Sequence, residues 1–589
     1  MIPRADAIAA LSSEPFDVVV VGGGITGAGV ALDAASRGYS VALVEKNDYA
    51  SGTSSRSSKL VHGGLRYLQQ FDLGLVREAL LERQLMVALA PHLVRPLKMV
   101  VPAFGGARLD RVVAVGLNMY DVLSVDKIRR RRRRREGDRD RDGDAMVEWS
   151  PDRHRTISGE EVIELLPALA AREPTSGYLF YDCQTDDARL VLTVLGEAER
   201  FGAICANRVE VSELVHAGAG DRAAGVVVED RARDGERFTI RAKNVVNATG
   251  VWADRIRPEE LHDVAEVPTI RPSRGTHVLL DRDRLPLDAG AIVPAGGGRT
   301  IFALPWLGST LLGTTDNDFD GDIDHVRPPE EDVDYLLGAA NEFFATDLDS
   351  GDVAGAYAGV RPLISRSDAK KSVDISRKAE LYETSSGLIT ITGGKLTTWR
   401  RMAKMTVDRL VEREDREAPC RTHEIPLGMA VDPVELPDVD GAPQGAKAAL
   451  ADRYGHAAHD VLAIASERSE LAQPIVAGRP DLLAEAVFAA RREQVGGVGD
   501  VLLRRTRLGL LAARELCAPE GRAVERVARA LAPEQGWDRD RVGVEVERFR
   551  AEARDEGLAP GGGGPGGRAN GAPGSGPEGG SGAAVLRGP

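Results

Sequence analysis

Residues 16–45, FDVVVVGGGITGAGVALDAASRGYSVALVE, decide the fold of the first part of this chain. An apolar, β-branched run of strand length, 17–21, leads into three glycines, and a small-residue helical pattern then runs from about Gly24 to Arg37. A second apolar run ends at Glu45. This strand–turn–helix–strand unit of about 30 residues predicts a dinucleotide-binding fold.

Each glycine of the G-x-G-x-x-G motif has its own task in such a fold. Gly22 permits the tight turn, Gly24 lets the backbone approach a pyrophosphate, and Gly27 lets the helix lie close to the strand. The helix N-terminus then offers free amides and a partial positive charge to the phosphates. Glu45 follows 18 residues after Gly27 and can accept hydrogen bonds from the ribose hydroxyls, which disfavours NADP. A purely structural glycine turn would leave Glu45 unexplained.

Composition sets wider limits. At 589 residues the chain is long enough for two to four domains, and its net charge of −14 argues against general nucleic-acid binding. We expect no signal peptide, and no apolar run approaches the ~18 residues of a membrane span. The four cysteines are widely scattered, which fits a reducing compartment and gives no metal-binding spacing. The motif occurs once, so we expect one tightly bound dinucleotide and no separate nicotinamide cofactor.

The segment that follows the motif, 47–70, combines many Ser, Thr and Gly residues with Arg, Lys, His and Tyr, which suits a loop wrapped around phosphates. Its core, TSSRSSKLVHGGLRYL (53–68), resembles the FAD-dependent glycerol-3-phosphate dehydrogenase family of the aerobic, respiratory type, a branch of the D-amino-acid-oxidase-like group. Further matching stretches follow in the family's order: TDDARLVL (185–192), NATGVWAD (247–254), GTTD (313–316), GVRPL (359–363), GGKLTTWR (393–400) and GDVLLRRTRL (499–508).

The resemblance covers about residues 16–515 and implies a function. It implies FAD as the cofactor and oxidation of sn-glycerol 3-phosphate to dihydroxyacetone phosphate by hydride transfer to FAD. It further implies that electrons pass to a membrane quinone and that the protein binds peripherally to the inner face of the cytoplasmic membrane. A homodimer is a further possibility that the resemblance leaves open.

The expected fold class is α/β: a two-part, Rossmann-like FAD-binding domain of the D-amino-acid-oxidase-like type, an antiparallel-sheet substrate domain and a C-terminal helical domain. Helices are expected at 444–468, 480–494, 499–516, 521–532 and 540–554. The expected boundaries are 16–73, 151–260 and 354–415 for FAD binding, 74–150 for a helical lid with an arginine-rich insertion, 261–353 for the substrate sheet, 422–555 for the helical domain and 556–589 for a disordered Gly/Pro-rich tail.

The proposed reaction needs a base for the hydroxyl proton and cationic donors for the phosphate. His62 is the expected base because the ordinary imidazole pKa lies near working pH. A buried, hydrogen-bonded histidine near the flavin is the alternative. Arg361 could bind the phosphate bidentately, with an inter-domain salt bridge as the alternative. Lys395 precedes a helix whose N-terminus would face the flavin edge where negative charge develops, with a surface position as the alternative.

The full set of expected site residues follows from the motifs and the resemblance together. The catalytic residues are His62, Arg66, Arg361 and Lys395; the substrate-binding residues are Arg66, Tyr67, Arg274, Thr276, Arg361 and Lys395; no metal ligands are expected. Many relatives carry lysine at the position of Arg274, so its phosphate role is left open. The FAD-binding residues are Gly22, Gly24, Ile25, Gly27, Glu45, Ser54, Ser55, Ser57, Lys59, Gly63, Gly64, Ala248, Thr249, Gly250, Gly393, Gly394, Lys395, Leu396 and Thr397.

Two segments leave membrane contact open. The seven arginines 129–135 are read first as a solvated insertion, with attraction to anionic lipid headgroups or nucleic acid as alternatives. The apolar and basic segment 91–128 is either an interfacial surface or part of the core. An oxygen-using glycerol-3-phosphate oxidase, a D-amino-acid or glycine oxidase, and a non-catalytic flavoprotein are the competing functions. The several cations speak against the last two.

Overall fold

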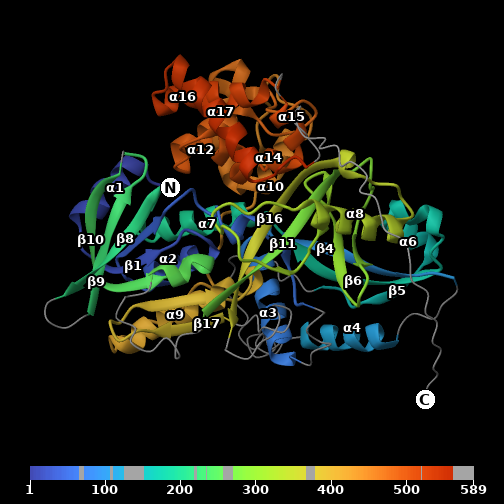
Figure 1. Cartoon of the computed structure of the whole chain (residues 1–589), viewed down its shortest axis with the longest axis horizontal. Coiled ribbons are helices and arrows are strands. Elements are labelled where there is room, and N and C mark those ends of the chain that lie inside the picture. Colours follow the sequence, from blue (N-terminus) through green and yellow to red (C-terminus); the bar gives the residue numbers. More distant parts are fainter. Residues whose placement is uncertain are drawn as a thin grey trace, which may run out of the picture.

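The computed structural model describes residues 1–64, 72–105, 111–124, 151–217, 222–233, 235–256, 269–365, 379–518 and 521–560. Two β-sheets lie side by side, and the C-terminal helices, orange to red, lie across one edge of both (Figure 1). The expectations for Arg66, Tyr67, the arginines 129–135 and the tail beyond residue 560 lie outside the described residues.

The first sheet carries the dinucleotide motif and is parallel at its centre. Its order is β17 (Ala379–Glu383), β18 (Ile389–Gly393), β10 (Glu236–Asn247), β1 (Phe16–Val21), β2 (Val41–Glu45) and β7 (Ile204–Asn207), with β9 (Arg222–Asp230) and β8 (Val209–Ala217) extending from β10. Its helices are α1 (Arg4–Ser13), α2 (Ile25–Ser36), α7 (Asp187–Arg200) and α9 (Trp399–Arg413). Parallel sheets are covered on both faces, which is why β1 is a continuous Val run and is largely buried.

Small residues let α2 pack tightly against both α7 and α9. A Cβ atom at Gly29 would lie 2.6 Å from the ring of Trp399, so the Trp399 side chain of α9 packs directly on the backbone of α2. Asp186 caps α7 by accepting hydrogen bonds from the amides of Ala188 and Arg189, at 3.1 and 3.3 Å. The packing of α2 against α7 and α9 holds in place the end of the first sheet that carries the glycine motif.

The second sheet is antiparallel except where β12 meets β4. Its order is β15 (Asn317–Asp318), β11 (Thr269–Asp281), β14 (Ser309–Gly313), β13 (Thr300–Trp306), β12 (Gly290–Pro294), β4 (Arg95–Ala103), β6 (Ser176–Gln184) and β3 (Leu60–Val61), with β16 (Val353–Ser365) beside β11 and β5 (Arg155–Ser158) beside β6. Its helices are α3 (Leu73–Leu89), α4 (Arg111–Ser124), α6 (Gly159–Leu165) and α8 (Glu330–Phe344). The helices α3 and α4 lie on the side opposite the C-terminal helices (Figure 1).

The second sheet is larger than the expected substrate segment 261–353. Strands β3, β4, β5 and β6 join it from the first 184 residues, and β16 joins it from the segment expected to bind FAD. The expected boundaries therefore need correction at these strands. The chain crosses between the sheets several times, and an apolar strand run does not indicate which sheet it will join.

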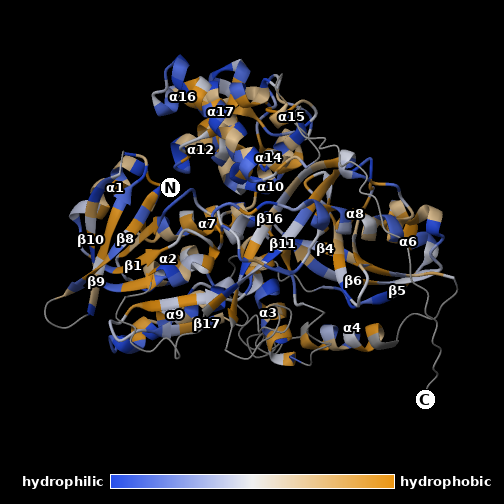
Figure 2. Ribbon diagram, viewed as in Figure 1, coloured by the Kyte–Doolittle hydropathy of each residue, from blue (hydrophilic) through white to orange (hydrophobic). Residues whose placement is uncertain are grey.

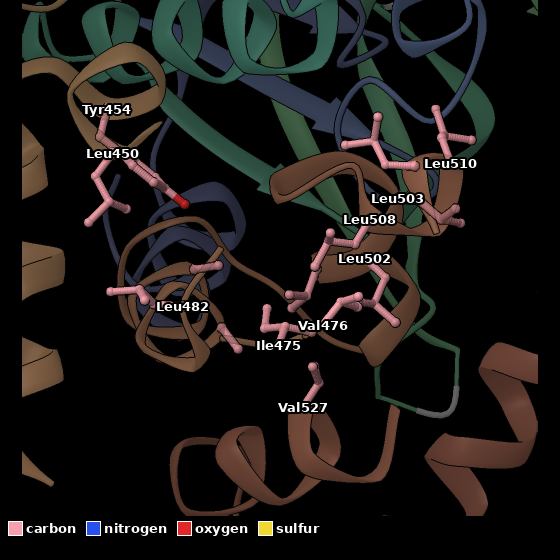
Figure 3. Packing of buried hydrophobic residues seen from close by; sticks show 14 of the residues in the cluster. Leu450, Tyr454, Ile475, Val476, Leu482, Leu502, Leu503, Leu508, Leu510 and Val527 are labelled. Carbon is pink, nitrogen blue, oxygen red and sulfur yellow. The ribbon is translucent and has the colours of Figure 1, made fainter. Parts of the chain in front are cut away.

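The C-terminal part is helical, as expected. Its helices are α10 (Ala446–Tyr454), α11 (Ala458–Glu467), α12 (Leu483–Arg492), α13 (Val498–Asp500), α14 (Leu508–Leu511), α15 (Ala513–Cys517), α16 (Ala523–Gln535) and α17 (Arg539–Asp555). Leucine, isoleucine and valine side chains from several of them meet in one cluster (Figure 3). Apolar segments are spread along the helices and strands throughout the molecule (Figure 2).

The segment 499–516, expected as one helix, is instead a series of short helical turns. A π-helical turn (Val501–Arg505) separates α13 from α14, and Arg507 adopts a left-handed backbone conformation with φ +66°. The periodic pattern misses this break because the arginines of this segment turn inward to buried carboxylates. No described helix is both long enough and apolar enough to cross a lipid bilayer.

Candidate active site

A large cavity opens at the carboxyl ends of the central strands of the first sheet, where ligands bind in doubly wound folds. It encloses about 1370 Å³ with its open mouth included. The ends of β1, β2, β10 and β18 all contribute to its wall, and the loop after β2 closes one side. The lining extends from the N-terminus of α2 to Pro362 of the second sheet, which suits an extended ligand.

The glycine motif is fitted to close approach. Gly22 has φ +113°, and a Cβ atom there would lie 2.7 Å from the carbonyl oxygen of Ala248. A Cβ atom at Gly27 would lie 1.9 Å from the Gly22 oxygen, so only glycine lets α2 lie on β1. The Ile25 amide donates to the Ser54 hydroxyl at 3.0 Å, which ties the first turn of α2 to the loop after β2. These contacts build a cradle for a phosphate at a helix N-terminus.

Glu45 ends β2 on the cavity wall. Its carboxylate accepts hydrogen bonds from the amides of Gly23 and Asn47, at 2.7 and 2.9 Å. Burial raises the pKa of this carboxyl, although both amide bonds oppose the rise. The ribose contact assigned to Glu45 stays a prediction.

Most of the expected FAD-binding residues share this one wall: Gly22, Gly24, Ile25, Glu45, Ser54, Ser57, Ala248, Thr249, Gly250, Gly393, Gly394, Lys395 and Leu396. The wall also contains residues that the sequence reasoning missed, among them Thr53, Trp252 and Met402. Trp252 was visible in the stretch NATGVWAD, but nothing in its spacing indicated that it faces the cavity. The expected residues Gly27, Ser55, Lys59, Gly63, Gly64 and Thr397 do not line the cavity.

Lys59 has a different place from the one expected. Its side chain is 0% exposed, and its ammonium donates to both carboxylate oxygens of Asp187, at 2.9 and 2.8 Å, and to the Ser55 carbonyl at 2.6 Å. Burial, together with the nearby charge of Arg507, lowers the pKa of Lys59 to about 7. Lys59 therefore belongs to a buried ion pair rather than to the cavity wall.

His62 and Lys395 approach each other through Thr397. The His62 amide donates to the Thr397 hydroxyl at 3.1 Å, and that hydroxyl lies 3.3 Å from the His62 carbonyl oxygen. Lys395 stands two residues earlier, on the cavity wall at the start of the short helix η7 (Leu396–Thr398). The His62 ring meets Phe302 of the second sheet edge-on, with ring centres 6.2 Å apart. His62 thus lies between the two sheets, beside the Lys395 turn.

Arg361 lies on β16, immediately before the cavity residue Pro362. Its guanidinium donates to the Asp316 carboxylate at 3.2 Å, the Thr314 hydroxyl at 3.1 Å and the Thr315 carbonyl at 3.2 Å. The side chain is 25% exposed. Its ion pair joins two segments of the second sheet, which differs from the inter-domain bridge considered as the alternative.

Arg274 and Thr276 both face the Asp332 carboxylate. Arg274 Nε lies 3.4 Å from Asp332 Oδ2, and the fully buried Thr276 hydroxyl donates to the same oxygen at 2.6 Å. Thr276 thus serves a buried hydrogen bond at the base of α8. Neither residue is part of the cavity wall.

A buried histidine near the Arg361 cluster was not singled out from the sequence. His277 Nε2 lies 2.8 Å from the Ser58 hydroxyl, and the ring stacks on Tyr357 with centres 4.8 Å apart. Burial and the charges of Lys59 and Arg361 hold the pKa of His277 well below its ordinary value, so the ring is neutral. His277 directly follows Thr276 in the sequence, but the alternation of side chains along a strand does not indicate a functional role for it. Within the described residues, no group of His, Cys, Asp and Glu side chains is arranged to hold a metal.

A phosphate cradle at a helix N-terminus, an acid at the end of the second strand and a large cavity at the strand ends are typical of a dinucleotide-binding protein. A family model described as FAD dependent oxidoreductase matches residues 17–409, and one described as the C-terminal domain of alpha-glycerophosphate oxidase matches residues 390–542. The residues fit the cofactor because Gly22 and Gly27 let α2 lie close to β1, which places the N-terminus of α2 at the cavity wall.

Curated proteins and solved structures narrow the class. The chain is 38% identical to glycerol-3-phosphate dehydrogenase 2 of Mycobacterium tuberculosis over 568 residues, 94% of this chain and 91% of that protein. It is 34% identical to the aerobic glycerol-3-phosphate dehydrogenase of Bacillus subtilis over 519 residues, 84% of this chain and 88% of that protein. The glycerol-3-phosphate dehydrogenase of Bacillus halodurans, solved with FAD, superposes with a TM-score of 0.71 at 30% identity, covering 94% of this chain and 97% of that one. The chain belongs to the FAD-dependent glycerol-3-phosphate dehydrogenase family.

Proposed function

We propose that this protein oxidises sn-glycerol 3-phosphate to dihydroxyacetone phosphate and passes the electrons to a membrane quinone. The observations that support the proposal are the place of Lys395 on the cavity wall, the hydrogen bonds that join His62 to Thr397, two residues after Lys395, and the position of Arg361 directly before the cavity residue Pro362. The family supports it, since its relatives carry the name of this activity. FAD, when bound, supplies the two-electron acceptor.

The residues take three roles in this proposal. A ring nitrogen of His62 accepts the proton of the substrate hydroxyl at carbon 2. Arg361 and Lys395, with Arg66 and Tyr67 beyond the described residues, hold the phosphate by charge-assisted hydrogen bonds. Asp316 keeps the Arg361 guanidinium oriented, so the phosphate meets a cation that is already in place.

Quinone reduction requires a membrane-facing surface, and α4 is the proposed one. Leu117 and Tyr120 on one side of this helix are buried, whereas Val115 and Val122 are 59% and 71% exposed. An exposed apolar stripe on an amphipathic helix suits shallow insertion at a lipid interface. The proposed location is the inner face of the cytoplasmic membrane, where the protein would bind peripherally.

The activity is tested on the purified yellow protein. Glycerol 3-phosphate should bleach the flavin absorbance, whereas glycerol and D-alanine should not. Arg361→Gln should raise the KM for glycerol 3-phosphate at least tenfold, about 1.4 kcal/mol, and leave the FAD content unchanged. Equal bleaching by wild type and variant would remove Arg361 from the phosphate site, and stoichiometric peroxide in air would identify an oxidase instead.

Membrane contact is tested with vesicles of anionic phospholipid that contain a quinone. The variant Val115→Asp/Val122→Asp should lose vesicle binding and quinone turnover but keep activity with a soluble dye as acceptor. Val544→Asp is the matched control, since Val544 is also an exposed valine on a helix, in the C-terminal part. Equal vesicle binding by all three proteins would contradict the assignment of α4.

A further inference from the structure

We propose that the C-terminal helical part holds the FAD-binding loop in its working shape through three buried arginines. The loop is residues 46–59, which follows β2 and contributes Ser54 and Ser57 to the cavity wall. The arginines are Arg504, Arg505 and Arg507, called here the arginine trio. They are positioning residues: they act on the cofactor through the loop and do not line the cavity themselves.

The first part of the loop is held at Asp48. Arg504 Nε lies 2.6 Å from one carboxylate oxygen of Asp48, and Arg505 donates to both oxygens, at 2.8 and 2.9 Å. Asp48 comes three residues after Glu45 and is buried, so this contact fixes the chain as it leaves β2. The Tyr49 hydroxyl adds a 3.1 Å hydrogen bond to the Gln494 side chain of the helical part.

The second part of the loop is held at Ser55. Arg507 donates to the Ser55 carbonyl oxygen at 2.7 Å and to Asp187 Oδ1 at 3.1 Å. Asp187 in turn accepts hydrogen bonds from the amide and the hydroxyl of Ser57, at 3.0 and 2.7 Å. Arg507 therefore holds Ser55, which lies between the wall residues Ser54 and Ser57. It also holds Ser57 indirectly, through Asp187.

Two observations indicate that the shape of the loop depends on its contacts with the arginine trio. Its sequence, KNDYASGTSSRSSK, is rich in Ser and, apart from the buried Tyr49 and Ala50, has no apolar side chain to order it by burial. Arg505 and Arg507 are 0% exposed, and a buried charge that loses its partner is strongly unfavourable. The helical part and the loop therefore keep each other in place, and coupling of this kind is reciprocal.

The test is FAD dissociation from the full-length holoenzyme, measured without substrate. Arg507→Met should raise the Kd for FAD at least about fivefold, the lower end of typical coupling between sites. Arg453→Met is the matched control. Arg453 is also a buried arginine of the helical part, and it pairs with Asp481 at 2.6 Å and with Glu485. It meets the trio segment only through a 3.5 Å contact with the Thr506 carbonyl oxygen, and none of its hydrogen bonds reaches the loop. The control should lose thermal stability but keep the wild-type FAD affinity.

Excess FAD separates a positioning role from general damage. In Arg507→Met, saturating FAD should restore kcat with an unchanged KM for glycerol 3-phosphate, because only cofactor retention is impaired. Should that variant fail to fold, Arg507→Lys keeps the buried charge but loses the two-pronged contact, and the same rise in Kd is expected. Wild-type Kd values in the arginine variants, or an equal rise in Arg453→Met, would overturn the proposal.

Hydrogen exchange gives an independent readout that does not depend on activity. Adding FAD to the wild-type apoprotein should slow exchange of amides in both the loop and residues 501–511, but not in α16, whose side chains bond to Ile475, Val495 and Arg491. In Arg507→Met the protection of 501–511 should be lost while that at the α2 N-terminus remains. Protection by FAD that is confined to the first sheet in the wild type would contradict the coupling.

Discussion

At the scale of single residues, the phosphate cradle depends on glycine, because any other residue would add a Cβ atom to a closely packed position. Gly27→Ala would place a Cβ atom 1.9 Å from the Gly22 oxygen, so α2 must move away from β1. We expect the variant to be purified without FAD, as measured by the absence of flavin absorbance. Gly196→Ala is the control, because a Cβ atom there meets nothing within 4 Å on α7. It should keep its FAD and gain stability by about 0.5–1 kcal/mol. A yellow Gly27→Ala protein would contradict the cradle.

His92 predicts a specific pH dependence of stability. Burial, with the charges of Arg95 and Arg189, lowers the pKa of His92 from 6.5 to about 4, and its Nδ1 has no hydrogen-bond partner in the described structure. The unfolded state therefore binds the proton first as the pH falls, and the folded state loses stability between pH 6.5 and 4, by up to about 3 kcal/mol.

The variant His92→Phe has no group that titrates at this position. The difference in unfolding free energy between wild type and variant should shift in favour of the variant across this range, as urea titrations at each pH would measure. A pH-independent difference would contradict this assignment.

The residues most readily predicted were those whose role depends on the geometry of the backbone. Glycines at a strand–helix turn and an acid at the next strand end have fixed geometric tasks, so Gly22, Gly24 and Glu45 all lie at the cavity. Lys59 was misplaced because a lysine in a Ser-rich loop has the same sequence signal whether it binds a phosphate or a buried carboxylate. Its partner Asp187 is 128 residues away, and nothing in the sequence around Lys59 indicates that the two residues pair.

At the scale of secondary-structure elements, α4 is connected to the segment that carries His62. The Gly63 amide donates to the Tyr120 hydroxyl at 2.8 Å, and that hydroxyl donates to the Asp182 carboxylate at 2.5 Å. Tyr120→Phe leaves the buried amide poorly bonded, which costs about 1–3 kcal/mol, and lets the His62 segment shift. We expect kcat to fall about tenfold at full FAD occupancy. Steady-state kinetics with a soluble acceptor measures this.

The control for this prediction is Val115→Ala, on the exposed side of the same helix, which should change stability by less than about 0.5 kcal/mol and leave kcat unchanged. If Tyr120→Phe were to lower the melting temperature without changing kcat, the tyrosine would serve packing alone.

Elements with a strong local pattern were predicted well, and those shaped by distant partners were not. The dinucleotide unit and most C-terminal helices follow their sequence patterns. The segment 499–516 has the spacing of a helix, but its arginines pair with Asp48 and Asp187 on the FAD-binding side, and those pairings break it into turns. The membership of β3 to β6 in the second sheet likewise depends on pairings that no single strand encodes.

At the scale of the whole molecule, buried ion pairs join the helical part to the first sheet. Arg208, at the end of β7, pairs with Asp500 at 2.5 Å, and Arg189 of α7 pairs with Glu493. Separate unfolding of the helical part would leave these charges and Asp48 without partners, so we expect the holoenzyme to unfold in one cooperative transition.

Asp48→Asn tests this cooperativity, because it removes the carboxylate shared by Arg504 and Arg505 while keeping the side-chain volume. Breaking such a buried pair typically destabilises by about 3–5 kcal/mol, and the loss falls on the contact between the two parts rather than inside either of them. Calorimetry should show one heat-absorption peak for the wild type, and a lower-temperature shoulder in the variant as the helical part unfolds first. Glu467→Gln is the control, since Glu467 pairs with Arg491 at 2.9 Å on the exposed surface of the helical part and should leave a single peak. Two resolved peaks in the wild type would mean that the parts unfold independently despite their shared charges.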